Sequence, residues 1–494
     1  MKYRMLLIAF CLTGARCLAQ DYLDRLWLVG YNEFPGMPGS GNAQIRFTND
    51  TVTVEPVDLH LNFESTMAVG VGEQGNLLFY TNGCTINNAE GQPMPNGEGL
   101  NPGSIFDMAC PATGYISPRG ATALPAPGNP DLYYLIHMGV RYDPVKHINY
   151  GPLYYSVIDM NQNDGKGDVV SKNNVLADGQ LEPYDLVRHG NGRDWWLVAP
   201  EYATNRYHIF LISPTGITEQ TVQEVGTAPG CQRIGSTAFS QNGRRFVRYQ
   251  NCRAEVFDFD RCSGQLSLYR SVAPPAPLFS SGGVFLSPDG TSLFFASQYV
   301  LFQTDLLQDP AIPDTAFILN YDWGANIHLM QYGPDGHLYL NLMNRGTYLN
   351  AIANPQAAFG QAIDFRFSDI SLPVTNVRTL PHFPNFRLYD WGNSACDTLG
   401  ISQTQEEEFI QDINGLSIFP NPTTNRIYLT LTEPDVELLS VRLLDAQGQV
   451  IEHIRYPRAG WRICVLDLGA QPAGVYVVQV RTGLGWAIRK VVKL

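Results

Sequence analysis

The chain has 494 residues, of which 44% are apolar and 16% charged, so it is long enough for two or three domains with substantial cores. The net charge is −13, but residues 1–19 and 415–494 each carry +3, so the residues between them carry −19. Such an acidic main domain argues against nucleic acid as a partner, because phosphates require a basic face, and it permits a cation or a basic partner.

Residues 1–19 have the features of a signal peptide. Lys2 and Arg4 precede a short apolar run, residues 5–12, and small residues allow cleavage after Ala19. The run is too short to cross a bilayer, and no later segment has the roughly 18 apolar residues that a membrane helix needs. We therefore predict an exported protein without an integral membrane segment, in which disulfides can form.

Residues 20–395 consist of short strand-like runs in which helical periodicity is nearly absent. A strand–turn–strand unit recurs with Gly243, Gly290 and Gly336 in its turns, and looser copies surround Gly75, Gly128 and Gly192. A period near 46 residues with several strands per unit is typical of the blades of a β-propeller. Six units are visible, and residues 22–70 and 365–392 could together close a seventh. Seven blades is the preferred count, with six and eight as alternatives. A different alternative is a stack of unrelated β-hairpins.

One loop in this region carries a candidate metal site. Its oxygen-bearing side chains stand at nearly alternate positions, as in calcium loops: Asp159, Asn161, Asn163, Asp164 and Asp168. However, Gly165 comes one place late for an EF-hand, and no Glu occupies the last position. These departures favour a solvated turn, so calcium is an alternative and no cofactor is predicted.

Other motifs favour structural explanations. The glycines at 70, 72 and 75 match G-x-G-x-x-G, but a strand follows where a nucleotide site needs a helix. Asp258 and Asp260 could form a carboxylate pair, but the repeat aligns Asp258 with Asp305, which favours turn capping. Trp195 and Trp196 stand in a strand, where packing is the default explanation. The sequence lacks H-E-x-x-H, G-x-S-x-G and P-loop motifs, so no catalytic residue is predicted.

Seven cysteines remain after removal of the signal peptide. Cys231 and Cys252 flank the hairpin that turns at Gly243, so a Cys231–Cys252 bridge is preferred. Cys84 and Cys110 are paired on proximity alone, and Cys262 with Cys396 is a third pair. Cys464 lies between apolar residues and is expected to be a buried thiol.

Residues 396–414 are polar and acidic and are predicted to be a linker. After it, seven short strands follow in about 80 residues, at 416–419, 427–431, 439–444, 449–455, 461–468, 475–481 and 486–493. Seven short strands in this length predict a small Ig-like two-sheet β-sandwich over residues 415–494.

Four segments of this last region occur in a familiar order: Leu416-Ser-Ile-Phe-Pro-Asn-Pro, Val441-Arg-Leu-Leu-Asp-Ala-Gln-Gly, Pro472-Ala-Gly-Val-Tyr and Arg489-Lys-Val-Val-Lys. Together they resemble the type A C-terminal sorting domain of the type IX secretion system of Bacteroidota. The residues that carry the resemblance are Pro420, Asn421, Pro422, Gly448, Gly474, Tyr476, Lys490 and Lys493. It implies export across the outer membrane with the type IX machinery as partner, and release or surface anchoring.

Two shorter runs, Tyr80-Thr-Asn-Gly-Cys84 and Phe259-Asp-Arg-Cys262-Ser-Gly, resemble segments of secreted propeller proteins of the same bacteria, which brings no activity with it. The sequence therefore favours a non-enzymatic secreted or surface propeller that binds a glycan or a protein. The alternative is a secreted hydrolase or lyase acting on glycans, with carboxylates or a metal at the central channel. A passive surface component is a third hypothesis.

Overall fold

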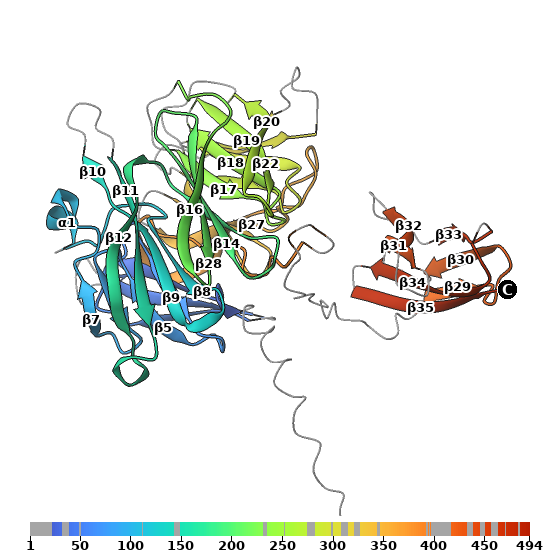
Figure 1. Ribbon diagram of the computed structural model, residues 1–494, viewed down its shortest axis with the longest axis horizontal. Coiled ribbons are helices and arrows are strands. Elements are labelled where there is room, and N and C mark those ends of the chain that lie inside the picture. The colour runs from blue at the N-terminus through green and yellow to red at the C-terminus, as the bar shows by residue number, and fades with distance from the viewer. Residues whose placement is uncertain are drawn as a thin grey trace, which may run out of the picture. The chain divides into compact units, whose positions relative to one another are not determined.

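The computed structural model describes residues 22–31, 39–48, 51–110, 112–142, 149–230, 235–250, 252–273, 282–297, 300–307, 315–320, 327–342, 346–391, 394, 396, 416–431, 438–444, 450–455, 463–469, 471–482 and 485–494. The chain forms two compact units, Met1–Ser402 and Gln403–Leu494, so the division falls in the segment expected to be a linker (Figure 1). The signal peptide and Gly448 lie outside the described residues.

The first unit consists of seven antiparallel sheets in its described residues, each built from consecutive strands. The first three sheets hold β1 (Leu26–Tyr31), β2 (Gly41–Phe47) and β3 (Val52–Val57); β4 (Ala68–Val71), β5 (Leu77–Thr81), β6 (Thr85–Asn88) and β7 (Pro93–Glu98); and β8 (Ala121–Ala126), β9 (Asn129–Met138), β10 (Arg141–Tyr142), β11 (Asn149–Asp159) and β12 (Asp168–Leu181). A short helix, α1 (Ser104–Ala109), precedes the third sheet.

The next four sheets have four strands each. They hold β13 (Asp185–Arg188), β14 (Trp195–Pro200), β15 (Arg206–Ser213) and β16 (Gly216–Glu224); β17 (Ser236–Phe239), β18 (Arg245–Gln250), β19 (Arg253–Asp260) and β20 (Gln265–Val272); β21 (Val284–Leu286), β22 (Ser292–Ser297), β23 (Val300–Asp305) and β24 (Thr315–Asn320); and β25 (Ile327–Tyr332), β26 (Leu338–Leu342), β27 (Gly346–Ile352) and β28 (Phe365–Asn376).

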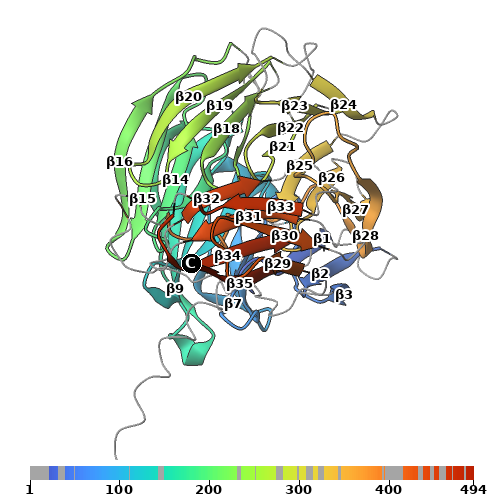
Figure 2. The same ribbon diagram turned by 90° about the vertical axis from the view of Figure 1, so that its right-hand side faces the viewer.

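The sheets follow one another around a common centre in chain order, a propeller-like arrangement (Figure 2). First strands contact each other from sheet to sheet, as β13 contacts β17 and β17 contacts β21. Tyrosines add hydrogen bonds between sheets: the Tyr133 hydroxyl donates to the Val71 carbonyl at 2.8 Å and that of Tyr249 to the Ala296 carbonyl at 3.0 Å. The apolar strands of neighbouring sheets thereby bury each other's faces.

The repeat read from the sequence corresponds to the first hairpin of six successive sheets. All six of its glycines adopt positive φ, namely Gly75, Gly128, Gly192, Gly243, Gly290 and Gly336, with values between 67° and 87°. Each lies in the turn between the first two strands of a sheet, where such a backbone conformation favours glycine. The G-x-G-x-x-G motif is one of these turns, as expected, with the Gly75 N–H donating to the Gly72 carbonyl.

The first and last sheets meet, but without sharing a strand. Residues 22–70 and 365–392 were considered able to close one blade together; in the structure β1–β3 pair with one another, β4 pairs with β5 and β28 pairs with β27. At the junction β28 contacts β1, β2 and β3, and the Thr375 N–H donates to the Gly39 carbonyl at 2.7 Å. The Trp27 ring of β1 lies 5.4 Å from the Tyr339 ring of β26, edge to face. The ring of sheets is therefore closed here by packing rather than by a shared hydrogen-bonded ladder.

The second unit has seven strands in its described residues, each within two residues of its predicted bounds. They form one three-stranded sheet, of β29 (Leu416–Phe419), β30 (Arg426–Leu431) and β33 (Ile463–Asp467), and one four-stranded sheet, of β31 (Leu438–Leu444), β32 (Val450–Arg455), β34 (Gly474–Thr482) and β35 (Gly485–Lys493). Both sheets contribute to one apolar core, in which Leu429, Val441 and Val478 are fully buried. Cys464 is buried here too, as expected.

Two disulfides are present among the described residues, and both were expected pairs. Cys84 bonds to Cys110 and Cys262 to Cys396, with Cα–Cα distances of 5.6 and 5.4 Å. Cys231 lies outside the described residues, so the Cys231–Cys252 bridge stays a prediction.

Candidate functional site

The centre of the first unit is occupied by the chain itself. Residues 377–391, which we call the strap, follow β28 and bond in turn to several sheets. The Thr379 hydroxyl donates to the Phe63 carbonyl at 2.7 Å, the Asn385 side chain donates to the Gln241 carbonyl at 2.8 Å, and Arg387 makes two 2.6 Å bonds to the carboxylate of Asp24. Asp24 precedes β1 and Phe63 follows β3, so the strap contacts both flanks of the first sheet.

The end of the strap is held by residues of the fourth and fifth sheets. The Trp391 N–H donates to the Gly190 carbonyl at 2.7 Å, and the Arg261 guanidinium donates to the carbonyls of Arg188 and Tyr389. Cys396, five residues after Trp391, forms a disulfide with Cys262, which follows Arg261 in the sequence. Burial lowers the pKa of Arg261 to about 10, which leaves it cationic at neutral pH.

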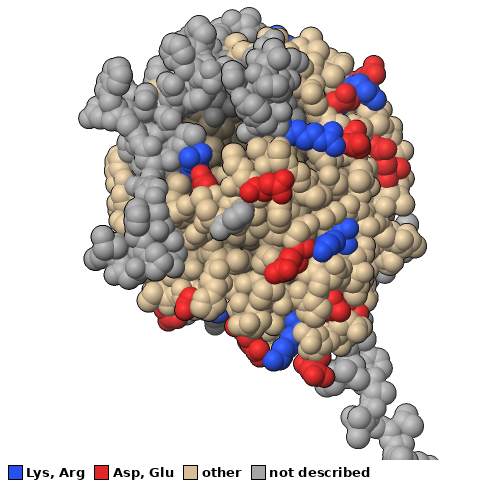
Figure 3. Space-filling model, turned by 90° about the vertical axis from the view of Figure 1, so that its left-hand side faces the viewer, with Lys and Arg blue, Asp and Glu red and all other residues tan. Residues whose placement is uncertain are grey.

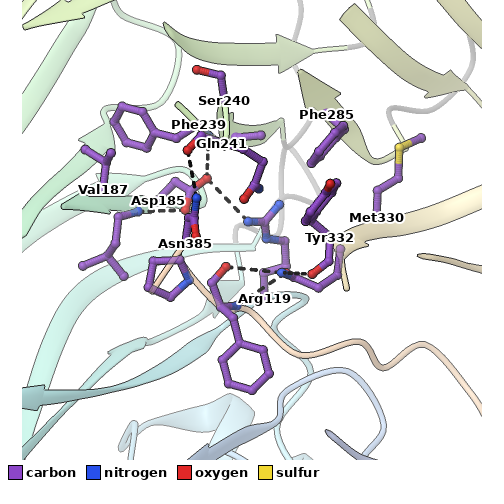
Figure 4. Close-up of a pocket in the computed structure, with 15 residues that line it drawn as sticks. Arg119, Asp185, Val187, Phe239, Ser240, Gln241, Phe285, Met330, Tyr332 and Asn385 are labelled. Carbon is purple, nitrogen blue, oxygen red and sulfur yellow. Dashed lines mark hydrogen bonds and ion pairs between the residues drawn. The ribbon is translucent and has the colours of Figure 1, made fainter. Parts of the chain in front are cut away.

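A buried polar network joins the strap to the inner strands. Asp185, the first residue of β13, faces the Arg119 guanidinium, which approaches its Oδ2 to 3.6 Å (Figure 4). Asp185 also accepts a 3.2 Å hydrogen bond from His382 Nε2 of the strap. His382 Nδ1 lies 3.0 Å from Thr122 Oγ1 of β8, and the Tyr184 hydroxyl lies 3.0 Å from the same oxygen. All five side chains are buried.

The charges in this network are fixed by its geometry. Burial alone raises the pKa of Asp185, but the hydrogen bond from His382 and the charge of Arg119 outweigh it and bring the pKa below its usual range. Burial, with the charge of Arg119, lowers the pKa of His382, which is therefore neutral. Because an ionised carboxylate only accepts, His382 Nε2 carries the proton and Nδ1 accepts from the Thr122 hydroxyl. The network thus contains one anion, one cation and a neutral imidazole.

A pocket lies beside the network. Its lining comes from the segment before β8, from the inner strands of the fourth to seventh sheets with the turn after β17, and from the strap: Arg119, Asp185, Leu186, Val187, Ala238, Phe239, Ser240, Gln241, Phe285, Met330, Gln331, Tyr332, Phe383, Pro384 and Asn385 (Figure 4). The space that water-sized molecules can occupy is about 30 Å³, enough for about two waters. Three of the polar lining residues are partly exposed and mark the mouth of the pocket: Gln241, Tyr332 and Asn385.

The order Thr122–His382–Asp185 matches that of a nucleophile, a base and an orienting carboxylate. However, Thr122 and His382 are 0% and 2% exposed and do not line the pocket, so a substrate has no route to the hydroxyl in this structure. Neither sequence motifs nor the repeat singled out these residues, because they come from separate sheets and from a strap without periodicity.

The candidate metal loop is the exposed turn between β11 and β12. The carboxylate of Asp159 accepts from the Asn161 N–H at 2.9 Å and from the Gln162 side chain at 3.0 Å. The ammonium of Lys166, from the same turn, pairs with Glu90 at 2.8 Å. In the part of the chain that the structure describes, no group of three His, Cys, Asp or Glu side chains is arranged to hold a metal ion.

The other sequence-predicted residues lie outside the pocket lining. The carboxylates of Asp258 and Asp260 are exposed: Asp258 lies 3.4 Å from Arg245, and Asp260 accepts from the Cys262 N–H at 2.7 Å, a turn-capping bond. Trp196 is buried and donates to the Arg261 carbonyl at 2.8 Å, so it serves packing as expected.

Several residues of the sorting motif hold the second unit together. The Asn421 side chain donates to the Lys490 carbonyl at 2.7 Å and accepts from the Val492 N–H at 2.9 Å, so the start of this unit is tied to β35. The Lys493 ammonium donates to the carbonyls of Gly469 and Gln471, and the Tyr476 hydroxyl donates to that of Pro472 at 2.7 Å. Pro420 and Pro422 flank Asn421 in its loop.

Buried histidines predict a loss of stability in mild acid. Burial lowers the pKa of His137 to about 3 and that of His328 to about 4, and it lowers that of His382. Because unfolding restores a pKa near 6.5, the unfolded chain binds these protons first. Stability is therefore lost as the pH falls below 6.5, by about 1.4 kcal/mol per pH unit for each histidine.

Urea unfolding at pH 7.5, 6.5 and 5.5 measures this loss. His137→Gln is expected to make the dependence on pH shallower, whereas His60→Gln, at a site where the side chain is 62% exposed, is expected to leave it unchanged. A free energy of unfolding that stays constant between pH 6.5 and 5.5 would contradict the prediction.

Comparison with known proteins identifies the second unit. Residues 417–494 match the family model of the secretion system C-terminal sorting domain, as the sequence motifs predicted. The match indicates export to the cell surface or the extracellular space, with the type IX machinery as partner. No helix among the described residues is long and apolar enough to span a membrane. No curated protein matches the chain.

The similar solved structures are distant. A candidate 6-phosphogluconolactonase of Bacteroides fragilis has 14% identity and a TM-score of 0.44, covering 71% of this chain and 96% of its own. A periplasmic gluconolactonase of Pseudomonas aeruginosa has 15% identity and a TM-score of 0.43 over 71% and 96%. The Swd1 β-propeller domain of Myceliophteria thermophila has 11% identity and a TM-score of 0.36 over 64% and 92%.

Proposed function

We propose that the chain is a non-enzymatic binding protein, displayed on the cell surface or released by the type IX system, whose first unit binds a glycan or a protein. The observation that supports this is the arrangement of the charged groups beside the pocket. Asp185 pairs with Arg119 and accepts a hydrogen bond from His382, and all three side chains are buried, so the two opposite charges compensate each other inside the fold. The remaining polar groups at the pocket mouth, Gln241 and Asn385, are neutral and suit recognition of a ligand.

The proposed architecture is a seven-bladed propeller, residues 20–395, followed by a linker, residues 396–414, and an Ig-like sandwich, residues 415–494, after a signal peptide cleaved behind Ala19. The seven sheets of the first unit support this count. The first sheet has three strands, one fewer than the four-stranded sheets. In our proposal the strap takes the place of its inner strand.

Binding is tested on glycan and protein arrays with the mature chain, in calcium and in EGTA. We expect binding to a defined ligand that is lost when Tyr332 or Gln241 at the pocket mouth is replaced by alanine. Tyr269, which lies on the outer strand β20, provides the matched control, and its replacement is expected to leave binding unchanged. Release of reducing ends from polysaccharides, abolished by Asp185→Asn under conditions where that variant is still folded by circular dichroism, would instead establish the glycan hydrolase or lyase.

Calcium is expected to have no effect on stability. The Asp159 carboxylate already accepts two hydrogen bonds within its turn, so a cation would have to displace them. The melting temperature should therefore be the same in 2 mM CaCl₂ as in EGTA, within about 1 °C, by the small effects typical of surface sites. A calcium-dependent rise that Asp159→Ala removes would establish the metal site.

The acidic first unit is not expected to bind nucleic acid. On the face in Figure 3, acidic and basic side chains are interspersed and separated by uncharged areas, without a continuous basic patch in what is described of it. A salt-sensitive complex with DNA at physiological ionic strength would contradict this expectation.

Export depends on the second unit in this proposal. Deleting residues 415–494 is expected to trap the chain in the periplasm, because the family match of residues 417–494 identifies the sorting signal. Fractionation and immunoblotting measure this, with the full chain carrying Asp258→Asn as the control for a substitution outside the signal. Normal levels of the truncated chain outside the cell would refute it.

A further inference from the structure

The size of the pocket limits what can enter it. Its space of about 30 Å³ corresponds to about two waters. Two adjacent hydroxyl groups, a vicinal diol, would replace about two waters, whereas a whole sugar ring or a phosphate group would replace more. A ligand can therefore insert only a small edge, while its remainder stays at the mouth beside Gln241, Tyr332 and Asn385.

The polar atoms of the pocket wall match a ligand group that can both accept and donate hydrogen bonds. Arg119 Nη1 donates to the Thr237 carbonyl at 3.0 Å, but Nε, in a side chain that is 8% exposed, lacks a hydrogen-bond partner in the described structure. Asp185 Oδ2, 3.6 Å from Arg119 Nη2, accepts one 2.9 Å bond, from the Phe239 N–H, and has a second lone pair. An unsatisfied buried donor is costly, so a ligand that accepts from Nε gains that energy back.

The charge of the wall excludes ions. Arg119 and Asp185 are a cation and an anion in contact, so an anionic ligand group would meet the carboxylate and a cationic one the guanidinium. Both would also lose their hydration in a buried pocket. A neutral pair of hydroxyls can accept from Arg119 and donate to Asp185 without either penalty.

The mouth supplies an apolar surface next to these groups. The Tyr332 ring stacks on that of Phe285, with centroids 5.7 Å apart and planes 1° from parallel, and Figure 4 shows both on the wall across from Asp185. Aromatic rings beside a few placed polar groups are the usual composition of pockets for small organic ligands. The C–H face of a sugar ring is such a ligand surface, and it carries its hydroxyls along one edge.

We infer that the pocket binds one edge of a neutral saccharide through a vicinal diol, whose two hydroxyls lie beside Arg119 and Asp185. This inference rests on the proposed binding function and names its ligand class. The oxygen of one hydroxyl accepts from Arg119 Nε, the O–H of the other donates to Asp185 Oδ2, and the sugar ring packs against Tyr332.

The test uses the mature full chain and methyl glycosides of mannose, galactose, glucose and fucose, each paired with analogues that lack one hydroxyl. Calorimetric titration is expected to find at least one glycoside that binds, and its affinity is expected to fall at least tenfold when either hydroxyl of one vicinal pair is removed. Arg119→Lys keeps the positive charge but loses Nε, and it is expected to weaken binding at least tenfold, whereas Arg245→Lys, outside the pocket lining, changes it less than twofold.

Because Arg119→Lys is a buried substitution, Tyr332→Ala and a crystal soaked with the glycoside serve as independent measurements. The soak is expected to show two hydroxyls at Arg119 and Asp185. A glycoside that binds both variants like the wild type, or two waters alone in the pocket, overturns the diol site but leaves the binding function intact. Binding of a protein but of no glycoside also overturns the diol site and leaves the binding function intact. Failure of every array ligand and every glycoside overturns both.

Discussion

Asp185→Asn is expected to lower the free energy of unfolding by about 3–5 kcal/mol, the effect of breaking a buried ion pair from one side. The substitution leaves the Arg119 guanidinium buried without its anion, and it removes the carboxylate that accepts from His382. Urea unfolding at pH 7.5 measures the change.

Two further variants define the cause. Asp258→Asn removes a carboxylate that is 54% exposed and 3.4 Å from Arg245, and it should cost less than about 1 kcal/mol. Adding Arg119→Met to Asp185→Asn should recover part of the loss, because no buried charge is then left without a partner. Equal losses for Asp185→Asn and Asp258→Asn would show that the buried pair contributes no more than a surface one.

Replacing Cys262 and Cys396 with serine is expected to have the second large effect. The disulfide joins residues 134 apart in sequence, and in the chain-entropy description it contributes about 5 kcal/mol by restricting the unfolded chain. The Cys84–Cys110 disulfide spans 26 residues and should contribute about 3.5 kcal/mol on the same basis.

The two double serine variants each remove one disulfide, so each serves as the control for the other. Their unfolding midpoints are compared under oxidising conditions. Loss of the Cys262–Cys396 bridge should also free the end of the strap, which raises proteolysis after Arg387 relative to the other variant. A larger loss of stability from the Cys84–Cys110 variant would contradict the expected order.

Local patterns predicted most of the fold. The turn glycines, such as Gly243 and Gly290, specify hairpins through a backbone conformation that a sequence shows directly, and the strands of the second unit follow from alternation over a few residues. The Cys84–Cys110 pair was found from proximity because its loop is short. Residues 22–70 and 365–392 were grouped in one blade, but β1–β3 belong to the first sheet, β4 to the second and β28 to the last. The order of strands at the junction depends on packing across the whole ring.

The candidate site could not be predicted in the same way. Arg119, Asp185 and His382 come from three distant segments, and each looks like an ordinary polar residue in its own segment. The strap has no period of 2 or 3.6, since it contacts a different sheet every few residues. Only the three-dimensional arrangement identifies them as neighbours.

The strap has a consequence for the order in which the chain folds. Arg387 pairs with Asp24 across 363 residues, and Thr379 bonds to the Phe63 carbonyl across 316 residues. Contacts this distant in sequence form late, because the loop they close must first lose its freedom. The flanks of the first sheet are thus covered only after nearly all of the first unit is present, because the strap that covers them comes last in it. In the periplasm, the time at which Cys262 and Cys396 become resistant to alkylation would then report when the ring closes.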